Sequence, residues 1–276
     1  MRIAYFLPVY KYPEQVSRLI ARIYSPLDCF YVHKDKGTPF YGWENIFDTY
    51  RSGNFLFIAK YKMGWGTFRM VEATLDAMNY FSTFDYDYFI NLSGQCYPIK
   101  PISMIKEELA KQNVADIECF KLPSSKWTNG GLDRINYFYF RVWQRHNIRI
   151  PLLKRTLPCN LEPYGGFTWF MLPKRFVNYI LDYVSGHPEI LRFYRYCEIP
   201  EEMFFATIIM NSPLKSDVVN DNKRYILWKK KPSPEILRKG DFDEIMRSRK
   251  LFARKFDINI DKDILDLIDK EILRTH

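Results

Sequence analysis

The N-terminal segment, residues 2–37, restricts the fold more than any other part of this chain. Arg2–Val9 is an apolar run of strand length, and Glu14–Tyr24 places its apolar residues at helical spacing. A second apolar run, Cys29–His33, follows directly. A strand, a helix and a second strand in close succession form a βαβ unit, whose two strands pair in parallel. The sequence therefore predicts an α/β fold built on a parallel sheet.

Ligands of such sheets bind beyond the carboxyl ends of the strands. Pro8 and Tyr10 lie at the end of the first strand, and Asp35 lies at the end of the second. These residues are therefore candidates for a nucleotide pocket, although Asp35 could equally be a solvated turn residue. No glycine-rich loop follows the first strand, which argues against a dinucleotide or P-loop site.

Further elements extend the α/β pattern. Phe55–Ala59 reads as a strand, and Tyr88–Gly94 reads as a buried strand that ends in a small-residue turn. An amphipathic helix that runs through Phe81 lies between them. Lys174–Val184 reads as another helix, whereas Asn113–Pro158 is expected to be irregular. We find neither an internal repeat nor a linker. The sequence predicts one domain over residues 1–276, with a nucleotide-binding half (1–112) and an acceptor half (113–276) that ends in a basic lobe.

The irregular middle is rich in aromatic and basic side chains. Such mixtures hold sugars in many pockets, but they also cover cores. The residues concerned are Lys126, Trp127, Arg134, Tyr137, Tyr139, Arg141 and Trp143. Gly165 and Gly166 then open a strand, which indicates either a close backbone approach to a ligand or a bulge.

Composition narrows the class of protein. Hydrophobic residues make up 47% of the 276 residues, enough for a packed core, and no apolar run reaches the roughly 18 residues that cross a bilayer. The five cysteines are scattered without a Cys-x-x-Cys pair, which is typical of reduced thiols in a cytosolic protein. The triplet Asp85–Asp87 precedes its strand and should face the wrong edge of the sheet for a metal–diphosphate site.

Positive charge is concentrated near the C-terminus. The formal net charge is +9, and residues 221–256 hold much of the excess. A basic segment of this kind can bind nucleic acid, an anionic membrane surface or a phosphate-bearing ligand. Its interleaved apolar residues, including Trp228 and Phe252, indicate that it is folded.

The stretch Glu198–Asn211 carries the strongest chemical candidate. Pro200, Glu201 and Glu202 precede an almost wholly apolar run, which predicts the first turn of a buried helix. The two acids could simply stabilise the helix start. Alternatively, a buried helix would hold one of them in a fixed place, where it could serve as a general base.

Several stretches together resemble the core-2/I-branching β-1,6-N-acetylglucosaminyltransferases, a family that includes the peptide O-xylosyltransferases. In family order these stretches are Ala4–Tyr24, Tyr31–Lys36, Trp65–Met78, Asn91–Ile99, Gly165–Leu172, Pro200–Thr207 and Leu251–Asp257. The resemblance implies a GT-A-type fold with a Rossmann-like nucleotide-binding sheet. It also implies an inverting, metal-independent transfer of N-acetylglucosamine or xylose from a UDP-sugar to a glycan hydroxyl, without a cofactor.

The resemblance also assigns roles to individual residues. Glu202 matches the catalytic base of the family's Pro-Asp-Glu motif, and Glu201 replaces the aspartate. Arg224 and Lys255 match two cations that take the place of a metal at the diphosphate. Asp35 matches a uridine contact, with Pro8, Tyr10 and Trp65 expected on the donor side. Acceptor contacts are expected at Lys126, Gly166, Thr168, Glu201 and at one of two acids, Asp116 or Glu118.

The departures from the animal members lead to a further expectation. Those members are anchored Golgi proteins with disulfides, and this sequence shows neither feature. We therefore expect a bacterial-type cytoplasmic enzyme of surface polysaccharide synthesis, resting on an anionic membrane through its basic face, with no nucleic-acid partner. The alternatives are a basic module that binds nucleic acid, and a protein that binds a sugar nucleotide without turning it over.

Overall fold

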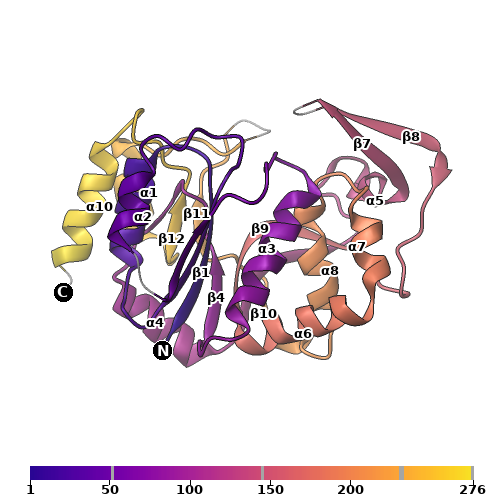
Figure 1. The fold of residues 1–276 in the computed structure, drawn as a ribbon, viewed down its shortest axis with the longest axis horizontal. Helices are drawn as coiled ribbons and strands as arrows, with labels where there is room; N and C mark the ends of the chain where they lie inside the picture. The colour runs from indigo at the N-terminus through magenta and orange to yellow at the C-terminus, as the bar shows by residue number, and fades with distance from the viewer. Residues whose placement is uncertain (51–52, 144–145, 230–232, 275–276) are drawn as a thin grey trace.

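The structure is a computed structural model that describes residues 1–50, 53–143, 146–229 and 233–274. A seven-stranded sheet crosses the molecule in the order β10-β6-β9-β4-β1-β2-β3 (Figure 1). Within it, β1 pairs in parallel with β2 and β4, while β9 is antiparallel to β4 and β6. The strands are β1 Ile3–Val9, β2 Cys29–Lys34, β3 Phe55–Ile58, β4 Tyr88–Asn91, β6 Ala115–Lys121, β9 Tyr164–Pro173 and β10 Val218–Val219.

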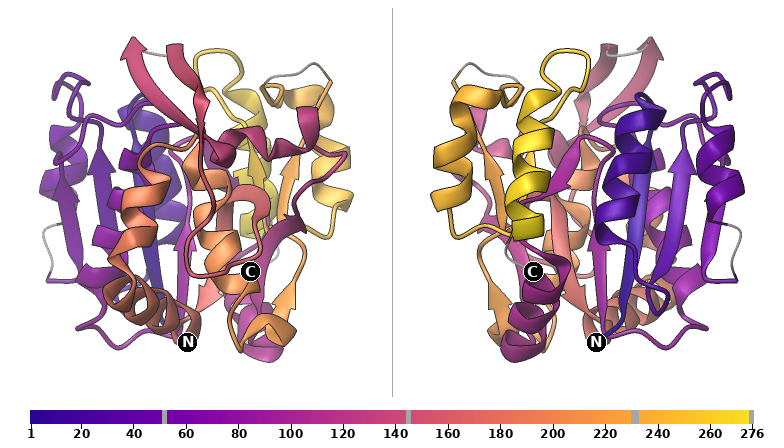
Figure 2. Two further views of the ribbon diagram at one scale, coloured as in Figure 1. Left: turned by 90° about the vertical axis from the view of Figure 1, so that its right-hand side faces the viewer. Right: turned by 90° about the vertical axis from the view of Figure 1, so that its left-hand side faces the viewer.

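Helices cover both faces of this sheet (Figure 2). Because successive strand residues point to opposite faces, Ala4 and Phe6 pack with one set of helices, and Tyr5 and Leu7 pack with the other. The first set is α3 Phe68–Phe81, α6 Lys174–Gly186, α7 Pro188–Tyr194 and α8 Phe204–Met210. The second set is α1 Pro13–Ile23, α2 Glu44–Thr49, α4 Ile102–Gln112, α9 Phe242–Arg247 and α10 Asp263–Arg274.

The predicted βαβ unit is confirmed. All seven residues of β1 are buried, as expected for a parallel strand covered on both faces. In α1 the buried residues include Val16, Leu19 and Ile20, which form the apolar stripe read from the sequence. The sheet also takes strands from both sides of residue 112, so the two predicted halves share one sheet.

A second sheet lies beyond the carboxyl end of β4. It has the strand order β11-β12-β5, with bounds β5 Cys96–Pro98, β11 Arg224–Ile226 and β12 Phe252–Arg254. β12 is parallel to β11 and antiparallel to β5. The described parts of the basic segment, residues 221–229 and 233–256, therefore fold into the body, and the motif residues lie beside the turn after β4.

The prediction of an irregular middle is wrong. After β6 and a short turn through η1 Thr128–Gly131 and α5 Asp133–Asn136, the chain forms an antiparallel hairpin of β7 Tyr137–Trp143 and β8 His146–Lys154. Aromatic and β-branched residues favour such pairing. The hairpin stands out from the carboxyl edge of the main sheet (Figure 1).

The stretch Glu198–Asn211 is not one helix. Pro200–Glu202 forms a 3₁₀ turn, η2, and α8 begins separately at Phe204. Met203 interrupts the helical path with φ −129°, and its amide donates to the carbonyl of Pro200. The expected burial of the following helix is confirmed, since Phe204–Ile209 is buried throughout. The two acids therefore lie in a turn ahead of the helix.

Candidate active site

Glu202 lies beside a cation and an aromatic ring. Its Oε2 accepts a hydrogen bond from Arg134 Nη1 at 2.7 Å, and 20% of its side chain remains exposed. The Arg134 guanidinium stacks 3.8 Å from the centre of the Trp127 ring. Burial raises the pKa of the Glu202 carboxyl, while Arg134 opposes that rise. The result is a carboxylate that is partly open to solvent, held in one orientation and more basic than usual.

The structure separates the two candidate acceptor acids. Glu118 accepts a hydrogen bond from Asn222 Nδ2 at 3.0 Å, and its charge contributes to the raised pKa of Glu202. Asp116 is fully buried, 3.9 Å from Lys223 Nζ, and burial raises its pKa to about 7. Glu118 is therefore the acid beside Glu202, and Asp116 belongs to the interior.

A bulge accounts for this difference. Residues 116 and 118 would share one face of a regular strand, but the β6–β9 register shifts between Ile117 and Cys119. Gly166 lies opposite this shift, and a Cβ on it would come 2.0 Å from the Glu118 carbonyl oxygen. Gly166 thus allows β6 and β9 to approach closely at a bulge, which is one of the two roles that the sequence suggested for Gly165 and Gly166. A ligand contact is not needed to explain this glycine.

The other predicted acceptor residues lie around this strand pair. The Thr168 carbonyl accepts a hydrogen bond from Asn91 Nδ2 at 2.7 Å, at the end of β4. Lys126 is exposed, with its ammonium 4.8 Å from the Phe120 ring centre, in the turn that also holds Trp127. Both residues stay candidates for acceptor contact.

Glu201 is buried and points away from solvent. Only 6% of the residue is exposed, and Oε1 accepts a hydrogen bond from the Gly66 amide at 3.0 Å. Oε2 is buried and has no hydrogen-bond partner among the described residues. Burial raises the pKa of Glu201 to about 8. The residue joins η2 to the loop ahead of α3, so we interpret it as a positioning residue for Glu202.

This burial predicts a pH-dependent stability. A carboxyl whose folded pKa is raised from 4.5 to about 8 stabilises the fold fully below pH 4.5, and that contribution is lost as the pH rises toward 8. Glu201→Gln removes the titration. Relative to wild type, the free energy of unfolding of this variant should increase by roughly 3–5 kcal/mol across this interval. Urea unfolding between about pH 4 and pH 9 measures it.

The matched control for this prediction is Glu107→Gln, on the exposed face of α4. Its free energy of unfolding at pH 7 should stay close to that of wild type. Parallel stability curves for Glu201→Gln and wild type would contradict the assignment of a buried, proton-binding Glu201.

The donor-side candidates gather at the carboxyl edge of the sheet. Pro8 is buried in β1 opposite His33, whereas Tyr10 is 51% exposed and donates through its hydroxyl to Gln95 Oε1 at 3.2 Å. Trp65 is 59% exposed, and its carbonyl accepts a hydrogen bond from Arg141 Nη2 at 2.7 Å. The two aromatic rings are thus available to a ligand.

Asp35 ties two loops together. It is 7% exposed, and its oxygens accept from the Gly37 amide at 2.7 Å and the Met63 amide at 2.5 Å. It is therefore not a solvated turn residue. Both oxygens are used by the backbone, so the structure explains Asp35 without a ligand, and its contact with uridine stays a prediction.

Three basic residues lie together on the second sheet. Pairing of β11 with β12 sets Arg224 opposite Phe252, and Ile226 opposite Arg254, which precedes Lys255. Arg224 is 3% exposed and donates from Nη2 to the Asn91 carbonyl at 2.7 Å. Burial lowers its pKa to about 10. Arg224 thus holds the end of β4 by this hydrogen bond, and its positive charge lies in the interior.

Arg254 and Lys255 lie nearer the surface. The Arg254 guanidinium lies 4.9 Å from the Trp169 ring centre, and burial lowers its pKa. Lys255 is half-buried, and its carbonyl accepts the Leu237 amide at 2.9 Å. The charge of Glu118 acts on Glu202, and Asn222 is hydrogen-bonded to both Glu118 and the Arg224 amide, so Glu118 and Asn222 lie between the candidate base and Arg224.

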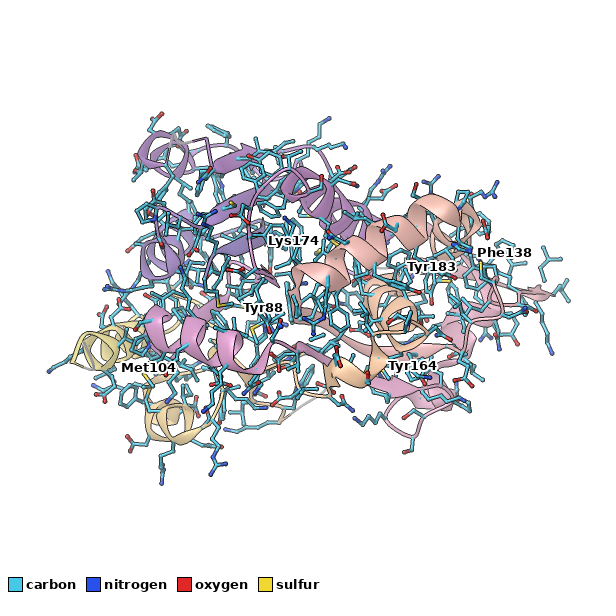
Figure 3. The ribbon with its side chains drawn as sticks, turned by 90° about the horizontal axis from the view of Figure 1, so that it is seen from below. Tyr88, Met104, Phe138, Tyr164, Lys174 and Tyr183 are labelled. Atoms are coloured by element: carbon cyan, nitrogen blue, oxygen red, sulfur yellow. The ribbon has the colours of Figure 1, made fainter. Side chains whose placement is uncertain are left out.

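The Asp85–Asp87 triplet lies at the opposite edge of the sheet, as predicted. Asp87 accepts the Arg2 amide at 2.7 Å, and Asp85 pairs with the Arg2 guanidinium. Lys174, labelled in Figure 3, donates to the carbonyl of Phe84, the residue before this triplet. Within the described residues, no group of three or more His, Cys, Asp or Glu side chains could hold a metal ion. Among the residues that the structure describes, no helix is both long enough and apolar enough to cross a membrane.

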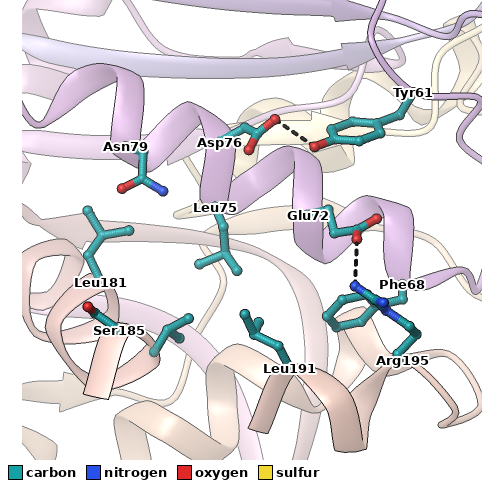
Figure 4. Close-up of a pocket in the computed structure, with 11 residues that line it drawn as sticks. Tyr61, Phe68, Glu72, Leu75, Asp76, Asn79, Leu181, Ser185, Leu191 and Arg195 are labelled. Carbon is teal, nitrogen blue, oxygen red and sulfur yellow. Dashed lines mark hydrogen bonds and ion pairs between the residues drawn. The ribbon is translucent and has the colours of Figure 1, made fainter. Parts of the chain in front are cut away.

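Two cavities flank the start of α3. The larger, of about 440 Å³, lies between α3, α6 and α7, where Glu72 pairs with Arg195 and Asp76 accepts from Tyr61 (Figure 4). The second, of about 330 Å³, shares Glu72 and Arg195 and reaches Gly66 and Arg141. Only the second approaches the Glu201 turn, so the larger cavity lies apart from the candidate chemistry.

Sequence reasoning missed two residues of this site as named candidates. Arg134 is one of the residues named in the aromatic and basic segment, but no local sequence pattern indicated that it pairs with Glu202. Arg254 is adjacent to Lys255 in the motif Phe252–Asp257, and its positive charge could have indicated a second cation for the diphosphate.

The sequence matches the model of one known protein family. The family model described as Core-2/I-Branching enzyme matches residues 3–246. The chain belongs to this family. Together with the observed sheet order, membership of the Core-2/I-Branching family confirms the GT-A-type α/β fold that the sequence predicted.

Curated relatives of this Core-2/I-Branching chain include xylosyltransferase 2 of Mus musculus and xylosyltransferase 1 of Homo sapiens, each 26% identical over 98% of the chain. The chain spans 33% and 30% of their lengths, respectively. Solved structures with a more distant likeness include the galactosyltransferase LgtC, with donor and acceptor sugar analogues (TM-score 0.44), and apo mouse xyloside xylosyltransferase 1 (TM-score 0.41). Each is 10% identical, and the matches cover 98% and 92% of this chain, and 96% and 97% of those chains.

Proposed function

We propose that this protein is an inverting, metal-independent glycosyltransferase that moves a sugar from a UDP-sugar to a carbohydrate hydroxyl. The observation that carries the proposal is Glu202: a partly exposed carboxylate of raised pKa that accepts a hydrogen bond from Arg134. A hydroxyl nucleophile needs a positioned base, and a departing diphosphate needs fixed positive charge.

Glu202 and the three basic residues account for the proton and the leaving group of the proposed sugar transfer. The acceptor oxygen attacks the anomeric carbon from the side opposite the diphosphate, and its proton passes to Glu202. The bond from the anomeric carbon to the phosphate oxygen breaks, and UDP leaves with the electron pair. Arg254 and Lys255 stabilise the developing charge, while buried Arg224 adds a longer-range contribution.

The motif set and the named relatives support different donor sugars. The resemblance to the β-1,6-N-acetylglucosaminyltransferases favours N-acetylglucosamine, whereas the named relatives are xylosyltransferases. We propose N-acetylglucosamine as the first donor to test and xylose as the second. UDP release from each sugar nucleotide, with hydrolysis as the readout when no acceptor is added, distinguishes them.

UDP binding without a metal is the direct test. At about 100-fold excess over its Kd, a ligand stabilises the folded state by about 2.7 kcal/mol. UDP should therefore raise the melting temperature by roughly 5 °C, and the same shift should persist in EDTA. Differential scanning fluorimetry measures it, with CDP and ADP as controls. A shift that appears only with Mg²⁺ or Mn²⁺ would contradict metal independence, and no shift at all would contradict a UDP site.

A further inference from the structure

The loop ahead of α3 carries an exposed aromatic ring on a fixed backbone. We call residues 63–67 the Trp65 loop, and Trp65 itself is 59% exposed. Thr67 closes the loop on itself, because its amide and its hydroxyl both donate to the Gly64 carbonyl, at 3.2 Å and 2.7 Å. An aromatic side chain on a backbone that is already ordered can bind a ligand at a low cost in conformational entropy.

Three other elements hold the Trp65 loop from outside. At the end of β2, Asp35 Oδ2 accepts the amide of the first residue of the loop at 2.5 Å. In η2, Glu201 Oε1 accepts the Gly66 amide at 3.0 Å. In β7 of the hairpin, Arg141 donates from Nη2 to the Trp65 carbonyl at 2.7 Å. The loop is thus tied to the main sheet, to the turn that holds the candidate base, and to the hairpin.

Arg141 reaches the Trp65 loop beside a cavity. Residues of both elements line this cavity of about 330 Å³, among them Tyr139, Arg141 and Asn147 from the hairpin and Gly66 and Thr67 from the loop. Figure 1 shows the chain entering α3 on the side of the molecule from which the hairpin projects. Because open space lies between the two elements here, shortening the Arg141 side chain would leave the loop without support on this side.

The place of the Arg141 guanidinium is costly. Its Nε and Nη1 are buried and have no hydrogen-bond partner among the described residues. Burial lowers the pKa of Arg141, and the charge of Glu201 opposes that change. A buried cation with two unsatisfied N–H groups is a poor source of stability. A need to fix the position of the Trp65 loop explains why an arginine stands there.

We propose that Arg141 is a positioning residue for donor binding, which holds the Trp65 loop so that the Trp65 ring meets the sugar nucleotide. The loop lies one hydrogen bond from the turn of the candidate base, because Gly66 donates to Glu201, the neighbour of Glu202. This inference rests on the proposed function, since it takes a sugar nucleotide to be bound beside Glu202. The hairpin of the acceptor half thereby orients a ring expected on the donor side.

A double-mutant cycle on donor affinity tests the proposal. The Kd values of the full chain for UDP-N-acetylglucosamine and UDP-xylose are measured by isothermal titration calorimetry. Arg141→Ala should weaken binding of the preferred donor by about tenfold, as expected for the loss of a hydrogen bond from a charged group. Trp65→Ala should weaken it by at least as much, through loss of an aromatic contact. The double variant should match Trp65→Ala within about twofold, because Arg141 acts through Trp65.

Further measurements separate positioning from chemistry. At saturating donor, kcat of Arg141→Ala should stay within about threefold of wild type, because Glu202 and its partner Arg134 are unchanged. Arg141→Lys should recover part of the lost affinity, since its ammonium group keeps the charge and can donate to the Trp65 carbonyl. The matched control is Arg149→Ala, on the same face of the hairpin, which should keep Kd within about twofold of wild type.

Three results would overturn the proposal. Arg141→Ala could bind the donor as tightly as wild type, or Trp65→Ala could do so. Alternatively, the losses of the two single variants could multiply in the double variant, in which case Arg141 acts independently of Trp65. All three differ from failure of the proposed function, in which wild type itself binds neither sugar nucleotide. Melting temperatures without ligand check that each variant folds, and Arg141→Gln enters the cycle if Arg141→Ala does not.

Discussion

Glu202→Gln is expected to lower kcat by about 10²–10⁴-fold, the range for loss of a positioned general base. The amide has the same shape as the carboxylate but cannot take the proton of the acceptor hydroxyl. The hydrogen bond from Arg134 can still be accepted by the amide oxygen, so the turn should keep its position. UDP binding, measured by the melting shift, should be largely unchanged.

The pH profile adds a second readout. Because burial raises the pKa of Glu202, activity of the wild type should rise with pH through an apparent pKa above the usual carboxyl value. This acidic limb should be absent from the residual activity of Glu202→Gln. Glu107→Gln, an exposed change of the same kind on α4, should leave both kcat and the profile intact. Near-normal turnover in Glu202→Gln would show that another group accepts the proton.

Loss of the Lys255 charge has the second largest expected effect. Lys255→Ala should lower kcat/KM by about 10²–10³-fold, because fixed charge at a developing anion stabilises the transition state more than the ground state. Lys255→Arg should recover part of that loss, since it keeps the charge with a different geometry. UDP release with saturating and limiting donor measures both parameters.

Lys255 is a cleaner test than Arg224. Arg224 is almost fully buried and bonds the Asn91 carbonyl, so its removal would also disturb the end of β4. Lys239→Ala is the matched control, because the Lys239 side chain is 65% exposed. Its removal costs a long ion pair, in which Nζ lies 4.0 Å from Asp263 Oδ2. Normal kcat/KM in Lys255→Ala would contradict the role of this charge. Rescue of that variant by Mg²⁺ would indicate that a divalent ion shares the site.

Most of the sheet could be predicted from the sequence. β1, α1, β2, α3 and β4 were expected close to their observed bounds. Strands buried on both faces appear as unbroken apolar runs, and helices with one buried face show their stripe at helical spacing. Each of these signals lies within a few residues of the element it describes. The hairpin was missed because its aromatic and basic residues also suit a loop that binds sugar.

The sequence by itself determined the parallel α/β core, the buried run after Pro200 and the residue types needed for acid–base and phosphate chemistry. Only the tertiary structure decided which of them meet. The pairing of Arg134 with Glu202 joins residues 68 positions apart, and the bond from Asn222 to Glu118 spans 104 positions. The bulge in β6 separated Glu118, which bonds Asn222, from Asp116, which stays inside, while burial separated Glu201 from its neighbour Glu202. Local patterns record which face of an element is buried, but desolvation and charge pairing depend on what the rest of the chain places against that face.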